Sequence, residues 1–242
     1  MMTATRSDII VQLQRDILSL ECCKKQNTDV QDVGLGPVNN AFPNHTFPLG
    51  AVHEFHSAKA EDSAATGGFV SGILSSLMSR GGVCIWISAL RTIFPPALQS
   101  FGVPADKVIF INLSKEKEIL WATEEALKCE GLAAVVAEIE ELSFMASRRL
   151  QLATEQSGVT GFMLRHHPRS MNTTACVTRW NITHLPGELP EGMPGVGFPL
   201  WNVALLKVRN GKPGNWTVEF KDGRFRHPSK IAAIAQQEKK TG

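Results

Sequence analysis

One loop of the sequence has the position of a phosphate-binding loop, between an apolar strand at Ala51–Phe55 and an apolar helix that starts near Phe69. In a parallel sheet such a loop holds phosphate, because backbone N–H groups and the helix N-terminus point at the anion. The loop, His56–Gly68, fits a working GxxxxGK[ST] motif in no register. We therefore expect at most weak nucleotide binding, by the small and hydroxyl-bearing residues Ser63, Thr66, Gly67 and Gly68.

The charges near this loop oppose hydrolysis of a nucleotide. Glu61 and Asp62 place negative charge where a triphosphate would sit, and no Asp or Glu occurs from residue 81 to residue 105 to activate water. Glu138 follows the buried strand 132–136 and could hold magnesium only if a nucleotide binds; a solvated loop face is the more usual interpretation. We expect no enzyme activity, no catalytic residue and no bound metal or cofactor, with weak nucleotide binding left open.

Basic residues concentrate in the second half of the chain. From Lys207 to Lys230 seven Lys and Arg stand against two acidic residues, which suggests a face for DNA or for an acidic partner. Lysines that merely discourage edge pairing, or a solvated loop, are the alternatives. The candidate DNA- or partner-binding residues are Arg165, Arg169, Arg179, Lys207, Arg209, Lys212, Arg224 and Arg226.

The elements that must position these residues alternate along the chain. We predict strands at 51–55, 83–87, 108–111, 132–136 and 160–164, with helices between them. Fully apolar strands are typical of a parallel sheet covered on both faces. Further strands at 175–182, 203–208 and 216–220 include a hairpin around Asn210–Gly214. The predicted fold class is α/β, a mostly parallel sheet covered by helices on both faces, with C-terminal antiparallel strands.

The bulk properties favour one domain. The chain has 242 residues, 43% of them hydrophobic, and a net charge of only +2. No signal peptide or membrane-length apolar stretch occurs, so we expect a cytoplasmic protein without membrane contact. Its five cysteines form no CxxC pair and predict no zinc site. We predict an amphipathic helix at 1–25, a linker or a loop packed along the core at 26–47, a core domain at 48–227 and a flexible tail at 228–242.

Several stretches resemble the ImuA family, RecA-like proteins of bacterial mutagenesis cassettes. They are Ala51–Phe55 with Ala64–Gly67, then Leu120–Leu127, Ala146–Ala153 and Leu205–Phe220, in order within Pro48–Phe225. The resemblance implies a RecA-like core with a worn-down phosphate loop. RecA-like proteins bind single-stranded DNA through loops after later strands, which here would be Arg165–Thr174.

The resemblance also implies a function and partners. The implied function is assembly of a translesion complex in the SOS response. The implied partners are an ImuB-like inactive Y-family polymerase homologue and an error-prone DnaE-type polymerase. RecA, single-stranded DNA and a second copy of the chain (self-association) are further candidates. Two alternatives stay open: a SulA-type cell-division inhibitor that caps a tubulin-like filament protein, and a weak DNA-dependent ATPase.

Overall fold

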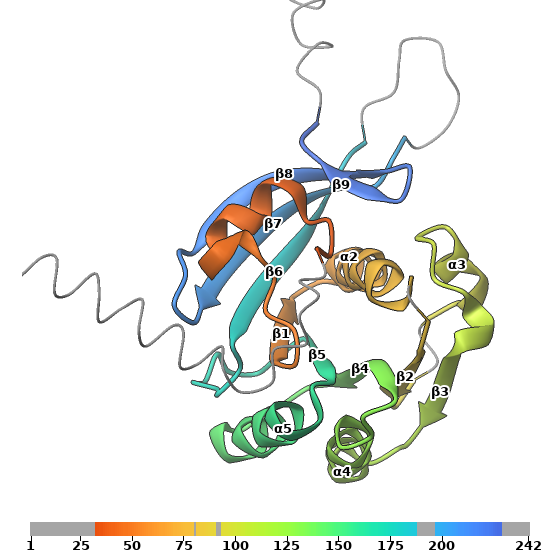
Figure 1. Ribbon diagram of the computed structural model, residues 1–242, viewed down its shortest axis with the longest axis vertical. Coiled ribbons are helices and arrows are strands. Elements are labelled where there is room, and N and C mark those ends of the chain that lie inside the picture. Colours follow the sequence, from red (N-terminus) through yellow and green to blue (C-terminus); the bar gives the residue numbers. More distant parts are fainter. Residues whose placement is uncertain (1–31, 80, 91–92, 188–196, 229–242) are drawn as a thin grey trace, which may run out of the picture. The chain divides into compact units, whose positions relative to one another are not determined.

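The computed structural model describes residues 32–79, 81–90, 93–187 and 197–228. In these residues one sheet has the strand order β3-β2-β4-β5-β1-β6-β7-β8-β9 (Figure 1). The strands are β1 (Val52–Ser57), β2 (Val83–Ser88), β3 (Val108–Asn112), β4 (Leu132–Ile139), β5 (Thr160–His166), β6 (Thr178–Leu185), β7 (Leu200–Val208), β8 (Gly214–Lys221) and β9 (Arg224–Arg226). The helices are α2 (Ala60–Met78), α3 (Pro95–Gln99), α4 (Glu116–Leu127) and α5 (Phe144–Ser157), with short 3-10 turns η1 (Gly36–Ala41), η2 (Pro43–His45) and η3 (Ala105–Lys107).

The direction of the strands divides the sheet in two. β3, β2, β4, β5, β1 and β6 pair in parallel, and β7, β8 and β9 continue the sheet antiparallel from β6. The central strands β2 and β4 are apolar on both faces, as Ala134–Val136 illustrates, because helices cover both sides. The prediction of an α/β, RecA-like core with C-terminal antiparallel strands is confirmed.

The two faces of the sheet carry separate apolar layers. Helix α2 packs on β6, β1, β4 and β5, and α4 and α5 pack on the opposite face, on β4 and β2 and on β1 and β5 respectively (Figure 1). On the α2 face Phe55 stacks on Trp180 at a centroid distance of 5.8 Å. The segment 32–47 joins this layer through buried residues such as Leu35 and Phe47, so this part of it is packed along the core.

The boundary of α2 is the largest difference from the prediction. The helix begins at Ala60, about nine residues before the expected start. Glu61 and Asp62 lie in its first turn, where the helix dipole stabilises negatively charged side chains. A Cβ at Gly68 would lie 2.8 Å from the Phe101 ring, and one at Gly72 would lie 2.5 Å from the Phe225 ring. These glycines therefore let distant aromatic rings pack against the helix.

Several smaller boundaries also differ. β6 starts at Thr178 instead of residue 175, and β9 was not predicted. The expected helix at 1–25 and most of the expected tail lie outside the described residues.

Candidate functional site

A helix occupies the position of the expected phosphate loop. Only Ala58 and Lys59 separate β1 from α2, so Ser63, Thr66, Gly67 and Gly68 all lie inside α2, and the prediction of a loop there is wrong. The Ser63 N–H donates to the Lys59 carbonyl at 3.0 Å, and the hydroxyls of Thr66 and Ser57 share a hydrogen bond of 2.9 Å. Because Thr66, Gly67 and Gly68 are buried within the helix, their backbone N–H groups are not presented to an anion.

The candidate magnesium ligand Glu138 lies inside β4, not after it. Its carboxylate accepts a hydrogen bond of 2.8 Å from the Trp86 indole N–H and lies 3.7 Å from His166 Nε2. Burial, with a contribution from His167, lowers the pKa of His166. Among the described residues, no group of three or more His, Cys, Asp and Glu is arranged to hold a metal ion. The structure thus gives Glu138 protein partners in place of a cation.

A mostly apolar hollow of about 450 Å³ lies beside the first turns of α2. Its walls include Phe101 and Trp201, whose rings stack at a centroid distance of 6.2 Å. Glu61 and His184 are the ionisable side chains of its described lining, which contains no Lys or Arg. Such a hollow does not suit a triphosphate, since nothing in that lining would balance the negative charge.

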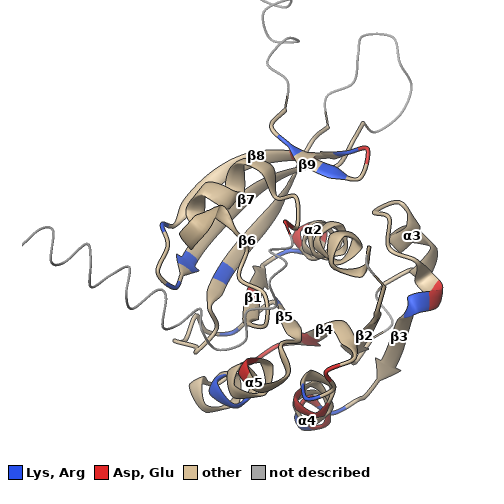
Figure 2. Ribbon diagram, viewed as in Figure 1, with Lys and Arg blue, Asp and Glu red and all other residues tan. Residues whose placement is uncertain are grey.

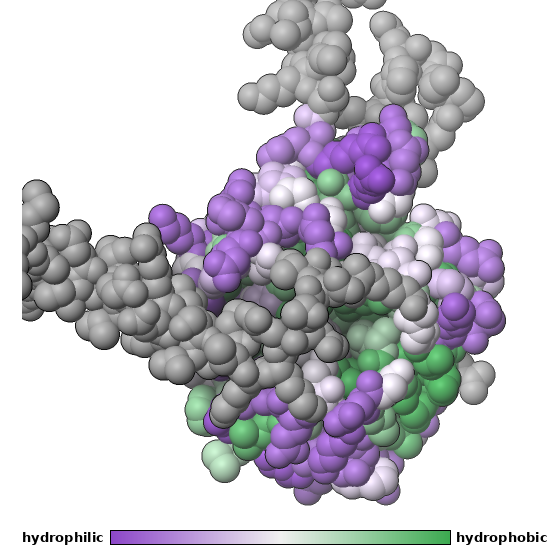
Figure 3. All heavy atoms as spheres, viewed as in Figure 1, coloured by the Kyte–Doolittle hydropathy of each residue, from purple (hydrophilic) through white to green (hydrophobic). Residues whose placement is uncertain are grey.

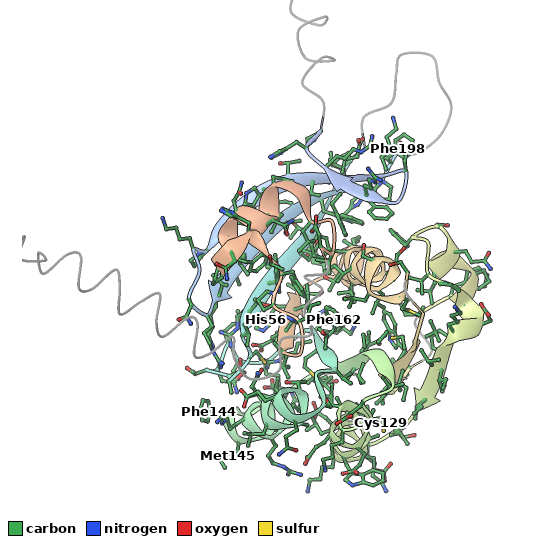
Figure 4. The ribbon with its side chains drawn as sticks, viewed as in Figure 1. His56, Cys129, Phe144, Met145, Phe162 and Phe198 are labelled. Carbon is green, nitrogen blue, oxygen red and sulfur yellow. The ribbon has the colours of Figure 1, made fainter. Side chains whose placement is uncertain are left out.

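A buried carboxylate, Glu54, lies on β1 at the centre of the sheet and accepts four hydrogen bonds. Its Oε1 accepts from Arg165 Nη1 and from His56 Nε2, each at 2.7 Å, and its Oε2 accepts from Thr174 Oγ1 at 2.7 Å and from Arg179 Nε at 3.0 Å. Although burial would raise it, the hydrogen bonds from His56, Thr174 and Arg165 lower the pKa of Glu54 to about 2. We call Glu54 and its four partners the ionic cluster: Glu54, His56, Arg165, Thr174 and Arg179. His56 is labelled in Figure 4.

Two residues predicted to contact DNA, Arg165 and Arg179, are bonded within the ionic cluster. Arg165 has no exposed side-chain surface, and it also donates to Glu141 Oε2 at 3.0 Å and to the Ser170 carbonyl at 3.2 Å. A side chain without exposed surface cannot reach a DNA phosphate, so the structure contradicts that role for Arg165. Arg179 is only 14% exposed and donates to the Asn172 carbonyl as well. Both arginines therefore hold the segment 167–177 onto the sheet.

Apart from Arg169, the other candidate cations lie at the two ends of the β7–β8 hairpin (Figure 2). The turn group consists of Lys207, Arg209 and Lys212, and the β9 group consists of Arg224 and Arg226. Leu200, which is in register with Glu219 and Arg226, lies seven residues before Lys207 on β7, roughly 23 Å at about 3.3 Å per residue. The positive charge of this segment is thus divided between two places. Arg169 is separate from both and is 84% exposed, 3.8 Å from Glu140.

Mostly neutral polar side chains lie between the two cationic groups, with the acidic Glu219 opposite Arg226 at one end. They alternate with the buried residues of β6, β7 and β8, and so occupy the face of these strands opposite α2. The register places Asn181, Ala204 and Asn215 in one row and Thr183, Asn202 and Thr217 in the next. We call these six residues the amide face.

Comparison with curated proteins supplies a family. The chain is 34% identical over 227 residues to Protein ImuA of Caulobacter vibrioides, in strains NA1000 / CB15N and ATCC 19089 / CIP 103742 / CB 15, which covers 88% of this chain and 93% of the relative. The chain belongs to the ImuA family. It is also 26% identical over 98 residues to Cell division inhibitor SulA of Photorhabdus laumondii subsp. laumondii, over 40% of this chain and 55% of that relative. No family model matches the chain.

In the described part of this ImuA-family chain, the candidate reaction-centre residues are bonded within the protein, whereas most of the candidate binding residues lie at the surface. In the described residues the phosphate-loop position, Glu138 and the ionic cluster are all bonded within the protein. The turn group, the β9 group and the amide face are polar features that lie together on one hairpin and its neighbouring strands. Among the residues described, no helix is long and apolar enough to cross a membrane.

Proposed function

We propose that this chain is a non-catalytic accessory protein of damage-induced (SOS) translesion DNA synthesis and mutagenesis. In this role it brings together an ImuB-like inactive Y-family polymerase homologue, an error-prone DnaE-type polymerase and DNA. Membership of the ImuA family supports the role in damage-induced mutagenesis. The observation that carries the non-catalytic part is the packing of α2 into the phosphate-loop position, with Gly68 against the Phe101 ring.

The amide face and the two cationic groups support direct contact with single-stranded DNA. A strand laid along the hairpin would place phosphates near the turn group and the β9 group and bases over Asn and Thr side chains, which can donate and accept hydrogen bonds. Lys221 and Arg224 lie directly opposite each other on β8 and β9. Two like charges at neighbouring positions disfavour each other, and a bound phosphate would relieve that repulsion.

ATP is expected to be a poor ligand. We expect phosphate release from ATP to stay at the level without protein, with or without single-stranded DNA, because Thr66, Gly67 and Gly68 are buried within α2 and Glu61 and Asp62 lie in its first turn. A RecA-type ATPase in the same assay controls its sensitivity. DNA-stimulated turnover that disappears in Lys59→Ala or Ser63→Ala would contradict this and favour the DNA-dependent ATPase.

Charge reversal at the hairpin is expected to weaken DNA binding. Arg209→Glu with Lys212→Glu, and separately Arg224→Glu with Arg226→Glu, should each lower the affinity for single-stranded DNA at least tenfold and reduce the steepness of its salt dependence by about one per lost phosphate contact. Lys117→Glu, an exposed lysine on α4, is the matched control and should bind as the wild type does. Fluorescence anisotropy over a series of salt concentrations measures both quantities.

The same variants separate DNA contact from partner contact. We expect wild-type protein from damage-treated cells to co-purify with polymerase-related partners, identified by mass spectrometry. If both charge-reversal variants bind single-stranded DNA as tightly as the wild type does, the hairpin does not contact DNA directly. Capture of a tubulin-like filament protein in place of polymerases would favour the SulA-type inhibitor, for which the partial SulA match is the supporting observation.

A further inference from the structure

The strand β3 ends the sheet on the side opposite β9, and its outer edge is open in the described part of the chain. Its sequence, Val-Ile-Phe-Ile-Asn, contains no charge, proline or glycine. Ile109 is 52% exposed and Phe110 is 37% exposed, and Figure 3 shows hydrophobic atoms gathered on the side of the molecule where β3 lies. Natural proteins protect open edges with charges, prolines or bulges, because a bare apolar edge pairs with other strands. This edge therefore has the properties of a strand that is paired in its working state.

The main chain of β3 presents alternate residues outward. The Leu113 N–H donates to the Ser88 carbonyl at 3.1 Å, on the β2 side. Because successive residues of a strand alternate in direction, the N–H and C=O groups of Val108, Phe110 and Asn112 point away from β2. Those three residues offer a complete set of donors and acceptors to one further strand.

The sequence around β3 is complementary to itself in the antiparallel direction. If two copies meet on a two-fold axis at Phe110, Phe110 lies opposite Phe110 and Val108 opposite Asn112, as hydrogen-bonded pairs. Ile109 then lies opposite Ile111, so apolar side chains meet apolar side chains. Each copy also carries the exposed Asp106 before the strand and the exposed Lys115 after it, and the antiparallel arrangement brings these opposite charges to the same end of the pair.

We propose that the partner of this edge is a second copy of this chain, paired antiparallel along Val108–Asn112 about a two-fold axis at Phe110. A two-fold dimer is the commonest closed assembly, and it uses the same patch on both copies, which a self-complementary strand supplies. The dimer covers both apolar edges at once and leaves the β7–β8 hairpin of each copy at the far end of its sheet. The inference does not depend on the proposed role in translesion synthesis.

The oligomeric state of the full chain tests the proposal. We expect light scattering coupled to size exclusion to give twice the chain mass for the wild type and the monomer mass for Phe110→Pro. Proline removes an outward N–H while the pairing of β3 with β2 remains, since that residue's N–H points away from β2. Ile109→Lys, a charge on the edge, should also give a monomer. Circular dichroism and thermal unfolding verify that both variants fold.

Met145→Lys is the matched control, because Met145 is a 70% exposed apolar residue on α5, on the side of the domain away from β3 (Figure 4). It should remain a dimer. A monomeric wild type, or a dimer that survives both edge variants, overturns the proposal.

A cross-link tests the register. Opposed residues of a hydrogen-bonded antiparallel pair have Cα atoms about 5.5 Å apart, within the range a disulfide spans. In a background with the cysteines at 22, 23 and 129 changed to serine, Phe110→Cys should form a covalent dimer on mild oxidation. Absence of that cross-link would overturn the two-fold register at Phe110.

Discussion

Glu54→Gln is expected to destabilise the fold by about 3–5 kcal/mol, because it leaves buried arginines without their carboxylate. Glu54 has no exposed surface, and it accepts hydrogen bonds from both Arg165 and Arg179. Glutamine keeps the size of the side chain, so the loss reports the charge and its hydrogen bonds, not a cavity. Urea unfolding of the variant and the wild type at neutral pH measures the difference in free energy of unfolding.

Glu118→Gln makes the same chemical change at an exposed ion pair. Glu118 lies 2.9 Å from Lys115, and the two side chains are 46% and 78% exposed. Exposed pairs of this kind contribute about 0–1 kcal/mol, so this variant should unfold almost as the wild type does. Equal losses in Glu118→Gln and Glu54→Gln would mean that the ionic cluster does not hold the sheet together.

The ionic cluster also links stability to the cationic hairpin. Arg165 and Arg179 hold Ser170 and Asn172, and the Lys207 Nζ donates to the Thr174 carbonyl at 2.8 Å. The segment 167–177 thus connects the centre of the sheet to the turn group. A cluster that loses Glu54 should therefore loosen the position of Lys207 as well as lower stability.

The sequence allowed the order of helices and strands to be predicted well, because each strand of the parallel part is a short apolar run bounded by polar residues. It misplaced the start of α2, since Gly67 and Gly68 after a strand look like phosphate-loop glycines. What fills the space beside Gly68 is Phe101 and Trp201, from distant parts of the chain. Only the tertiary packing identifies these glycines as helical.

The candidate site was less predictable than the fold. Arg165 and Arg179 look like DNA contacts in a basic, polar stretch, but their carboxylate partner Glu54 lies 111 and 125 residues away in sequence. The apolar sequence of β3 was visible, whereas its place at the sheet edge depends on the strand order. Pairing across long sequence distances leaves no local pattern.

His53 is the residue expected to make the fold sensitive to mild acid. It is fully buried on β1 and stacks on Phe47 at a centroid distance of 4.3 Å. Its Nδ1 lies 2.7 Å from Thr178 Oγ1 and its Nε2 lies 2.8 Å from the Pro48 carbonyl. The Trp180 indole donates to the same Thr178 oxygen, so the threonine hydroxyl can donate to Nδ1 while Nε2–H donates to Pro48, an arrangement for the neutral ring.

Stability should therefore fall as the pH drops below the ordinary histidine pKa. Burial lowers the pKa of His53 from 6.5 to about 3, even though the hydrogen bond to Pro48 opposes the shift. Between these two values the unfolded chain binds a proton that the folded chain does not, so the free energy of unfolding decreases by up to about 1.4 kcal/mol per pH unit. The lowered pKa of Glu54 adds a second decrease between about 4.5 and about 2.

His53→Gln is expected to flatten the first decrease and keep the second. The variant loses stacking on Phe47 and so starts from a lower stability, which makes the slope against pH the informative quantity. His166, whose pKa is also lowered, leaves a smaller slope below pH 6.5 in the variant. Denaturant unfolding across this pH range in both proteins gives the slopes, and parallel curves would show that His53 is not the group that titrates.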